Sequence, residues 1–295
     1  RIYVTAQKSP LKSLEFITLR VKDAVCDHFR TVAGRRPNVD TADPAVRIHL
    51  FLTVDTATLY VDTTGEPLYK RGYKPAAVEA PLKENLAAGI LRLTGWQPDE
   101  ALVDPMCGSG TFLIEAAQMA LDIAPGLGRG FAFERLRIHD RGAWAALRRA
   151  AEQRRKPARV LPIFGSDVVG EWVRRSRMNL DAAGLADCVR LDRADVLERT
   201  PPAAAGVMVA NPPYGVRIGE AEELLAFYPR LGDALKQRWG GWRCYLFSAD
   251  PELPRHIGLK ASRRTPLFNG ALECRLFEYR MVAGSNRERT PRPQE

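Results

Sequence analysis

The sequence holds few of the side chains that build disulfide frameworks or metal sites. Among 295 residues there are five cysteines and four histidines, and no two cysteines form a C-x-x-C pair. They are Cys26, Cys107, Cys188, Cys244 and Cys274, and His28, His49, His139 and His256. An odd, scattered set of cysteines indicates reduced thiols in the cytosol. We therefore predict neither a disulfide framework nor a metal site.

Long apolar runs are also absent. No stretch approaches the roughly 20 apolar residues that a membrane-spanning helix needs, and no signal peptide is visible. Hydrophobic residues make up 45% and charged residues 27%, which is ordinary for a globular protein. The sequence predicts a cytoplasmic protein without a membrane partner. Because it begins at Arg1 and not at a methionine, we expect a piece of a longer protein.

Positive charge is what the sequence has in excess. The net charge is +9 and the isoelectric point about 9.5, which favours a polyanionic partner. Candidate phosphate contacts near the N-terminus are Lys22, Arg30, Arg35, Arg36, Arg47, Lys70 and Arg71. From charge alone, a solvated surface is the simpler interpretation of these residues.

The first 72 residues read as an α/β region. Apolar residues at helical spacing predict a helix over 14–29. The runs 48–52 and 58–61 predict two strands joined by a turn at Asp55.

A strand, a glycine turn and a helix are predicted between residues 101 and 121. In the turn D-P-M-C-G-S-G-T, Gly108 and Gly110 allow backbone to approach a ligand where a Cβ would collide. The helix start offers amides to a carboxylate, and Asp104 can pair with an ammonium group. An acid there would repel a phosphate, and the turn matches neither the P-loop nor the dinucleotide fingerprint. The pattern indicates the methionine part of S-adenosylmethionine.

Two more acids end predicted strands. Asp167, after the run 161–166, is placed to accept both hydroxyls of a ribose. Asp195, after the run 189–191, can accept from an adenine amine. Each acid alone is equally explained as a helix cap, but their order after the glycine turn favours the ligand.

The stretch 122–159 is longer than a simple crossover requires. It holds a basic helical patch of Arg148, Arg149, Arg154, Arg155 and Lys156. Two interpretations stay open for this patch: a contact with nucleic acid, or a solvated helix face.

The chain is organised around N-P-P-Y-G at 211–215, which follows the apolar run 207–210. Methylation of a planar amine needs acceptors for the amine hydrogens, because the nitrogen becomes positive as the methyl arrives. The side-chain oxygen of Asn211 is one acceptor and the carbonyl of Pro212 a second. Pro212 and Pro213 fix φ and have no N–H, and Tyr214 offers a face on which a base can stack. Alone, the motif is also explained as a turn.

The remaining pattern defines the fold class. A helix near 224–239, a strand at 243–248 and a pair of strands at 262–268 and 272–281 follow, the pair joined by the turn signal Asn269-Gly270. We predict an α/β fold: a mostly parallel sheet with helices on both faces and a C-terminal antiparallel hairpin.

With these motifs placed, the chain resembles the THUMP-domain guanine-N2 methyltransferases of large-subunit ribosomal RNA (the RlmL-like family, formerly the UPF0020 group). The resemblance spans nearly the whole chain. It rests on V-K-D-A-V at 21–25, R-P-N-V-D at 36–40, G-E-P-L-Y-K-R-G-Y at 65–73, A-P-L-K-E-N-L-A-A at 80–88, D-P-M-C-G-S-G-T at 104–111, N-P-P-Y-G at 211–215 and N-G-A-L-E-C at 269–274.

The resemblance implies the later part of an RNA-binding THUMP domain at 1–72 and a class I (Rossmann-like) methyltransferase domain at 73–283. The composition of the tail 284–295, rich in Arg, Pro and Glu, predicts disorder. The resemblance also implies S-adenosylmethionine as cofactor and ribosomal RNA or a pre-ribosomal particle as partner. The implied cofactor-binding residues are Asp104, Pro105, Cys107, Gly108, Gly110, Thr111, Asp167, Asp195 and Asn211. The implied catalytic residues, which hold the guanine N2, are Asn211, Pro212, Pro213 and Tyr214.

The family often has Asp-Ile-Asp where this chain has Asp167-Val168-Val169, which leaves Asp167 alone for the ribose. Some members also carry a second methyltransferase domain, which lies outside this sequence. The alternatives are methylation of transfer RNA, of an adenine N6 or of a protein glutamine amide, and a noncatalytic RNA-binding assembly factor. The RNA-binding-like first region weighs against the protein substrate.

Overall fold

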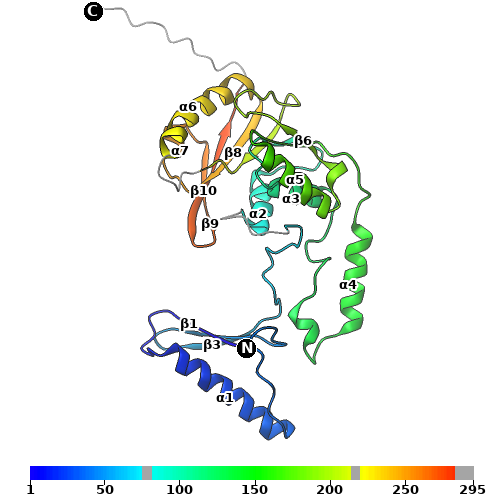
Figure 1. The fold of residues 1–295 in the computed structure, drawn as a ribbon, viewed down its shortest axis with the longest axis vertical. Helices are drawn as coiled ribbons and strands as arrows, with labels where there is room; N and C mark the ends of the chain where they lie inside the picture. The colour runs from blue at the N-terminus through cyan, green and yellow to red at the C-terminus, as the bar shows by residue number, and fades with distance from the viewer. Residues whose placement is uncertain (75–81, 214–219, 283–295) are drawn as a thin grey trace, which may run out of the picture. The chain divides into compact units, whose positions relative to one another are not determined.

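The computed structural model describes residues 1–74, 82–213 and 220–282. Contacts within the chain define two compact units, one of residues 1–68 and 128–150 and the other of residues 69–127 and 151–295. Each unit is described by itself (Figure 1). The predicted stacking residue Tyr214 and the predicted tail 284–295 lie outside the described residues.

The first unit contains a three-stranded sheet with one long helix. Strand β1 (Ile2–Ala6) runs parallel to β2 (Ile48–Leu52), which pairs antiparallel with β3 (Ala57–Val61). Helix α1 (Leu14–Ala33) runs along this sheet (Figure 1). The predicted helix and the two predicted strands are confirmed, whereas β1 was not predicted.

The first unit also contains a segment from the middle of the sequence, residues 128–150. It holds the short helix η1 (Ala132–Arg135) and most of α4 (Arg141–Arg154). The unusual length of the stretch 122–159 was visible in the sequence, but its return to the first unit was not foreseen.

The second unit is built on a seven-stranded sheet in the order β6-β5-β4-β7-β8-β10-β9. The strands are β4 (Leu102–Asp104), β5 (Ile163–Asp167), β6 (Arg190–Arg193), β7 (Gly206–Ala210), β8 (Trp242–Ser248), β9 (Arg263–Asn269) and β10 (Leu272–Arg280). Pairing is parallel from β6 to β8, and β10 runs antiparallel to both β8 and β9. The predicted mostly parallel sheet with an antiparallel C-terminal hairpin is confirmed.

Helices cover both faces of this sheet. They are α2 (Glu84–Thr94), α3 (Thr111–Ala120), α5 (Gly170–Ala182), η2 (Ala186–Cys188), α6 (Glu220–Arg238) and α7 (Leu253–His256). One buried cluster joins α2 and α3 to the sheet, with Ile90 and Phe112 among its members. A second joins α6 and α7 to the sheet, with Leu231 and Leu253. No helix of the described part is long and apolar enough to cross a membrane.

Strand β7, which leads to the N-P-P motif, begins at a glycine that its neighbours enclose. A Cβ on Gly206 would lie 2.5 Å from the carbonyl oxygen of Ala101 and 2.7 Å from the ring of Trp242. Gly89, inside α2, has open space around the same position. The two glycines therefore offer a matched pair of substitutions.

We expect Gly206→Ala to lower the free energy of unfolding by about 1–3 kcal/mol, because the methyl group has to displace backbone and a ring. Gly89→Ala should raise it by roughly 0.5–1 kcal/mol, because alanine favours the helix and restricts the unfolded chain. Urea unfolding of both variants measures the two effects. Equal stability of the two variants would contradict the packing described for β7.

Candidate functional site

A cavity of about 720 Å³ lies in the second unit, at the edge of the sheet where the parallel strands end. Its lining residues are Pro105, Met106, Gly108, Asp167, Val168, Val169, Trp172, Asp195, Val196, Asn211, Pro213 and Phe227. The turn after β4 and the N-P-P motif after β7 both contribute to it. The structure therefore places side by side two motifs that are about 100 residues apart in sequence.

Both glycines of the turn between β4 and α3 have a backbone conformation that favours glycine, and Gly110 also lacks space for a side chain. Gly108 (φ +52°) and Gly110 (φ +80°) both lie in the left-handed region that L-residues avoid. A Cβ on Gly110 would lie 3.0 Å from Ser176 Oγ, whereas one on Gly108 would meet no atom within 4 Å. A Cβ on Gly110 would therefore already crowd the protein itself, and the space beside Gly108 is open to a ligand, as the predicted close approach requires.

Helix α5 fastens this turn through its side chains. Ser176 Oγ donates to the carbonyl of Gly108 at 2.7 Å, and Asn179 Nδ2 donates to that of Ser109 at 2.9 Å. Ser176 is fully buried and Asn179 nearly so. The sequence analysis did not identify these two residues, because nothing local marks a side chain that bonds to the backbone of a distant turn.

Asp167, at the end of β5, holds the same turn from the other side. Its Oδ2 accepts from the Gly108 amide at 3.0 Å and its Oδ1 from the Val169 amide at 3.0 Å. Burial raises the pKa of Asp167, and these two hydrogen bonds oppose that rise. Carboxylate oxygens have further lone pairs, so Asp167 can still accept from hydroxyl groups in the cavity.

Asp104, at the end of β4, is 2% exposed and lies beneath the cavity instead of lining it. Its Oδ1 accepts from the Met106 amide at 3.3 Å. Burial raises the pKa of Asp104 well above its usual range, and the charge of Asp167 raises it further. Among the described residues, no basic side chain forms an ion pair with either acid.

Asp195 follows β6 and lines the cavity. Its Oδ1 accepts from the Leu197 amide at 2.9 Å within a turn. The described residues between β6 and β7 form no helix, so the helix-cap alternative is not found for Asp195. The second oxygen of the carboxylate remains for the cavity.

The N-P-P motif contains a hydrogen-bond acceptor to which no described group donates. Asn211 Oδ1 is buried and has no hydrogen-bond partner in the described part of the chain. The carbonyl of Pro213, by contrast, accepts from the Tyr228 hydroxyl at 2.6 Å. Burial raises the pKa of Tyr228 to about 12. Tyr228 stacks on His256, whose Nδ1 lies 2.8 Å from Asp250 Oδ2.

Some predicted site residues are buried behind the cavity surface. Besides Asp104, they are Cys107, Gly110, Thr111 and Pro212. Cys107 Sγ lies 3.6 Å from Ser176 Oγ, and burial raises the pKa of its thiol. These residues shape the turn from within.

The sequence analysis missed the apolar lining of the cavity. This lining comprises Met106, Val168, Val169, Trp172, Val196 and Phe227. Val168 is 56% exposed and Val169 48% exposed, which is unusual for two adjacent valines. Their position directly after Asp167 was the only indication in the sequence that they line the cavity. Over the ranges that the structure describes, no three side chains of His, Cys, Asp or Glu gather as a metal site would require.

Two family models match the chain. The model described as UPF0020, an RMKL-like methyltransferase domain, matches residues 71–278. The THUMP domain model matches residues 1–62.

Named relatives are similar over almost the whole chain. The ribosomal RNA large subunit methyltransferase K/L of Allochromatium vinosum is 43% identical over 287 residues, which cover 94% of this chain and 39% of the relative. The putative RNA methyltransferase slr0064 of Synechocystis is 39% identical over 95% of this chain and 73% of the relative. The chain thus spans about two fifths of the length of the K/L relatives.

Solved structures share the fold. SMU.472, a putative methyltransferase complexed with SAH, has a TM-score of 0.85 and 33% identity, with 95% of this chain and 75% of that chain covered. A possible methylase from Clostridium difficile 630 has a TM-score of 0.87 and 31% identity, with 99% and 74% covered. By sequence and by fold, the chain belongs to the UPF0020, RMKL-like methyltransferase family and carries a THUMP domain in its first 62 residues.

Proposed function

We propose that the chain binds S-adenosylmethionine in the cavity and transfers its methyl group to the exocyclic N2 amine of a guanine in large-subunit ribosomal RNA. The observation that carries this proposal is the buried, unpartnered oxygen of Asn211 in the same cavity as Gly108 and Asp167. The names of the relatives, a ribosomal RNA large subunit methyltransferase and a putative RNA methyltransferase, support the RNA substrate.

The described residues fit this cofactor. When bound, S-adenosylmethionine supplies an electrophilic methyl group on a sulfonium. Asp167 lines the cavity and Asp104 lies beneath it, and burial raises the pKa of both carboxyls. A ligand with a positive sulfonium and ammonium would favour their charged forms, because no described basic side chain forms an ion pair with either acid. The apolar side chains of Val168, Val169 and Trp172 suit the face of an adenine ring. The SAH complex of SMU.472 supports the same assignment.

The N-P-P motif would hold the acceptor amine. Asn211 Oδ1 accepts one amine hydrogen and stabilises the positive charge that develops on the nitrogen. Asn211 and Pro212 each precede a proline, which favours extended backbone with carbonyls pointing in different directions. The Tyr228 hydroxyl already donates a hydrogen bond to the carbonyl of Pro213. This leaves the carbonyl of Pro212, which the sequence suggested, as the second acceptor in our proposal. The contribution of these groups is positioning and charge stabilisation, with no strong base required.

Adenine N6 is the second candidate, because both amines present the same two hydrogens to these acceptors. One solved relative, 31% identical with a TM-score of 0.85, is named a predicted N6-adenine-specific DNA methylase, from Listeria monocytogenes. Mass mapping of nucleosides separates the two candidates. After incubation with unmodified ribosomal RNA, we expect N2-methylguanosine, and N6-methyladenosine alone would exclude our choice.

Asn211→Ala should lower kcat at least 100- to 1000-fold, about the loss seen when one charge-stabilising group is removed from an active site. Affinity for S-adenosylmethionine should stay within a few-fold of the wild type. Asn269→Ala is the matched control, since Asn269 Oδ1 is also buried without a partner in the described residues but lies at the β9–β10 turn. Single-turnover methylation and calorimetry measure the two quantities. Near-normal turnover of the Asn211 variant would refute the assignment.

Tyr228→Phe removes one hydroxyl and frees the carbonyl of Pro213. We expect kcat to fall roughly 2- to 12-fold, the equivalent of a hydrogen bond worth about 0.5–1.5 kcal/mol, while cofactor affinity stays unchanged. Tyr279→Phe provides the comparison, because the Tyr279 hydroxyl is buried without a partner among the described residues. If both variants lose kcat equally, Tyr228 does not position the motif.

Asp104→Asn should stabilise the unliganded protein and weaken cofactor binding. Folding raises the pKa of the Asp104 carboxyl, because the fold disfavours its charged form. The folded protein therefore loses stability as pH rises from the unfolded pKa of ~3.9 towards the folded pKa. Asparagine removes that charge and keeps an acceptor for the Met106 amide. Affinity for S-adenosylmethionine should fall about 10- to 150-fold, the value of a charge-assisted hydrogen bond of about 1.5–3 kcal/mol.

Thermal melts across pH 4–8, with and without S-adenosylmethionine, measure both effects of Asp104→Asn. The wild type should lose stability relative to the variant as pH rises, and the cofactor should reverse the order. A variant that is less stable and binds the cofactor as tightly would contradict the role of Asp104.

A further inference from the structure

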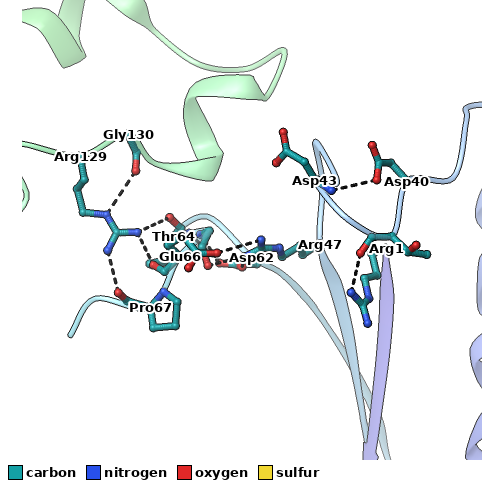
Figure 2. A network of polar contacts seen from close by, with 12 residues as sticks. Arg1, Asp40, Asp43, Arg47, Asp62, Thr64, Glu66, Pro67, Arg129 and Gly130 are labelled. Carbon is teal, nitrogen blue, oxygen red and sulfur yellow. Dashed lines mark hydrogen bonds and ion pairs between the residues drawn. The ribbon is translucent and has the colours of Figure 1, made fainter. Parts of the chain in front are cut away.

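Arg129 joins segment 128–150 to the rest of the first unit through several hydrogen bonds. The Arg129 guanidinium donates to the carbonyl of Pro67 at 2.9 Å and to that of Thr64 at 3.4 Å. It also donates to the carbonyl of Glu66. Figure 2 shows this side chain directed at the loop that follows β3. One planar, five-donor group thus satisfies three backbone acceptors, a geometry that lysine lacks.

Backbone bonds and an ion pair extend this attachment. The amides of Ala132 and Phe133 donate to the carbonyls of Thr64 and Thr63, at 3.3 and 3.0 Å. Arg135 forms two hydrogen bonds to the carboxylate of Asp43, at 3.2 and 3.3 Å.

Aromatic contacts join the two helical parts of the segment. The ring of Trp144 on α4 packs edge-on against Phe131 and Phe133, with centroids 5.6 and 4.9 Å apart. Segment 128–150 is therefore a structural part of the first unit.

The positive charge of the first unit resides mainly in this segment. Residues 1–68 contain nine basic and eight acidic side chains, a net charge of +1. Residues 128–150 contain six basic and two acidic side chains, a net charge of +4. The part that matches the THUMP model, residues 1–62, has nine basic and seven acidic side chains, a net charge of only +2, and the shorter segment supplies more of the charge that a polyanion would recognise.

Three arginines of the segment are available for such a partner. Arg129 and Arg135 are engaged within the unit, as described above. Arg137, Arg141 and Arg149 are exposed, and no ion pair or hydrogen bond of their side chains is found in the described ranges. Arginine binds phosphate oxygens through two parallel N–H donors.

We propose that segment 128–150 is a phosphate-binding element of the first unit and that Arg137, Arg141 and Arg149 contact the backbone of the substrate RNA. This proposal rests on the proposed function, because it takes RNA as the substrate. It assigns the electrostatic part of RNA binding to a segment outside the THUMP match. Residues 1–62, with their smaller net charge, then contribute shape more than charge.

The test compares two triple variants of the whole chain that remove the same charge from the same unit. Arg137→Gln, Arg141→Gln and Arg149→Gln are combined in one variant. The control combines Lys8→Gln, Lys12→Gln and Arg20→Gln, which are exposed positions of residues 1–68. Binding to unmodified ribosomal RNA is measured as a function of salt, and circular dichroism with thermal unfolding verifies that both variants fold.

The segment variant should lower the slope of log K against log salt by about 2, since each phosphate contact with a single strand contributes ~0.7. Its KM for RNA should rise more than tenfold with kcat unchanged. The control should keep the wild-type slope. An unchanged slope in the segment variant, or an equal loss in the control, would overturn this proposal. Failure of the wild type to bind RNA would instead overturn the proposed function.

Arg129→Lys adds a test that keeps the charge. Lysine cannot replace the fork that holds three carbonyls, so the docked segment should loosen and RNA affinity should fall although the net charge is unchanged. Wild-type RNA affinity in this variant would show that docking of the segment on the loop after β3 is not needed for binding, contrary to the proposal.

Discussion

The hydrogen bond between Asp167 Oδ2 and the Gly108 amide joins the electrostatics of the site to its geometry. It fixes the turn after β4 to the end of β5, so that the turn faces the cavity. It also helps Asp167 to keep a negative charge that burial disfavours. With Asp104 buried nearby, the edge of the sheet carries two acids without a basic partner among the described residues. A cationic ligand would favour the charged forms of both acids, which fits the cofactor that we propose.

The N-P-P motif after β7 also contains an unsatisfied group, in this case a hydrogen-bond acceptor without a donor. Asn211 Oδ1 is an acceptor that no described donor reaches, and the prolines beside it have no N–H to offer. The edges of β4, β5 and β7 thus present acceptors on both sides of one cavity. Such a surface is suited to a cationic ligand on one side and to an N–H donor on the other, which is what transfer of a methyl group to an amine requires.

The sequence predicted those parts of the site that lie on one short stretch. The strands before Asp104, Asp167 and Asn211 are apolar runs, and the carboxyl ends of parallel strands share an edge, so these residues were expected together. Ser176 and Tyr228 escaped prediction because each acts by donating to a backbone carbonyl of another element. Every residue has a carbonyl, so no pattern in the sequence marks such a pairing.

The place of segment 128–150 in the first unit was not predicted either, because its contacts are also made to backbone carbonyls far away in the sequence. The methyltransferase model matches 71–278 without interruption, yet residues 128–150 within it belong structurally to the first unit. The chain passes between the units at 68–69, 127–128 and 150–151. A fragment that ends at residue 72 would lack Arg129 and leave three carbonyls after β3 without their donor. The first unit is therefore complete only when the methyltransferase sequence is present.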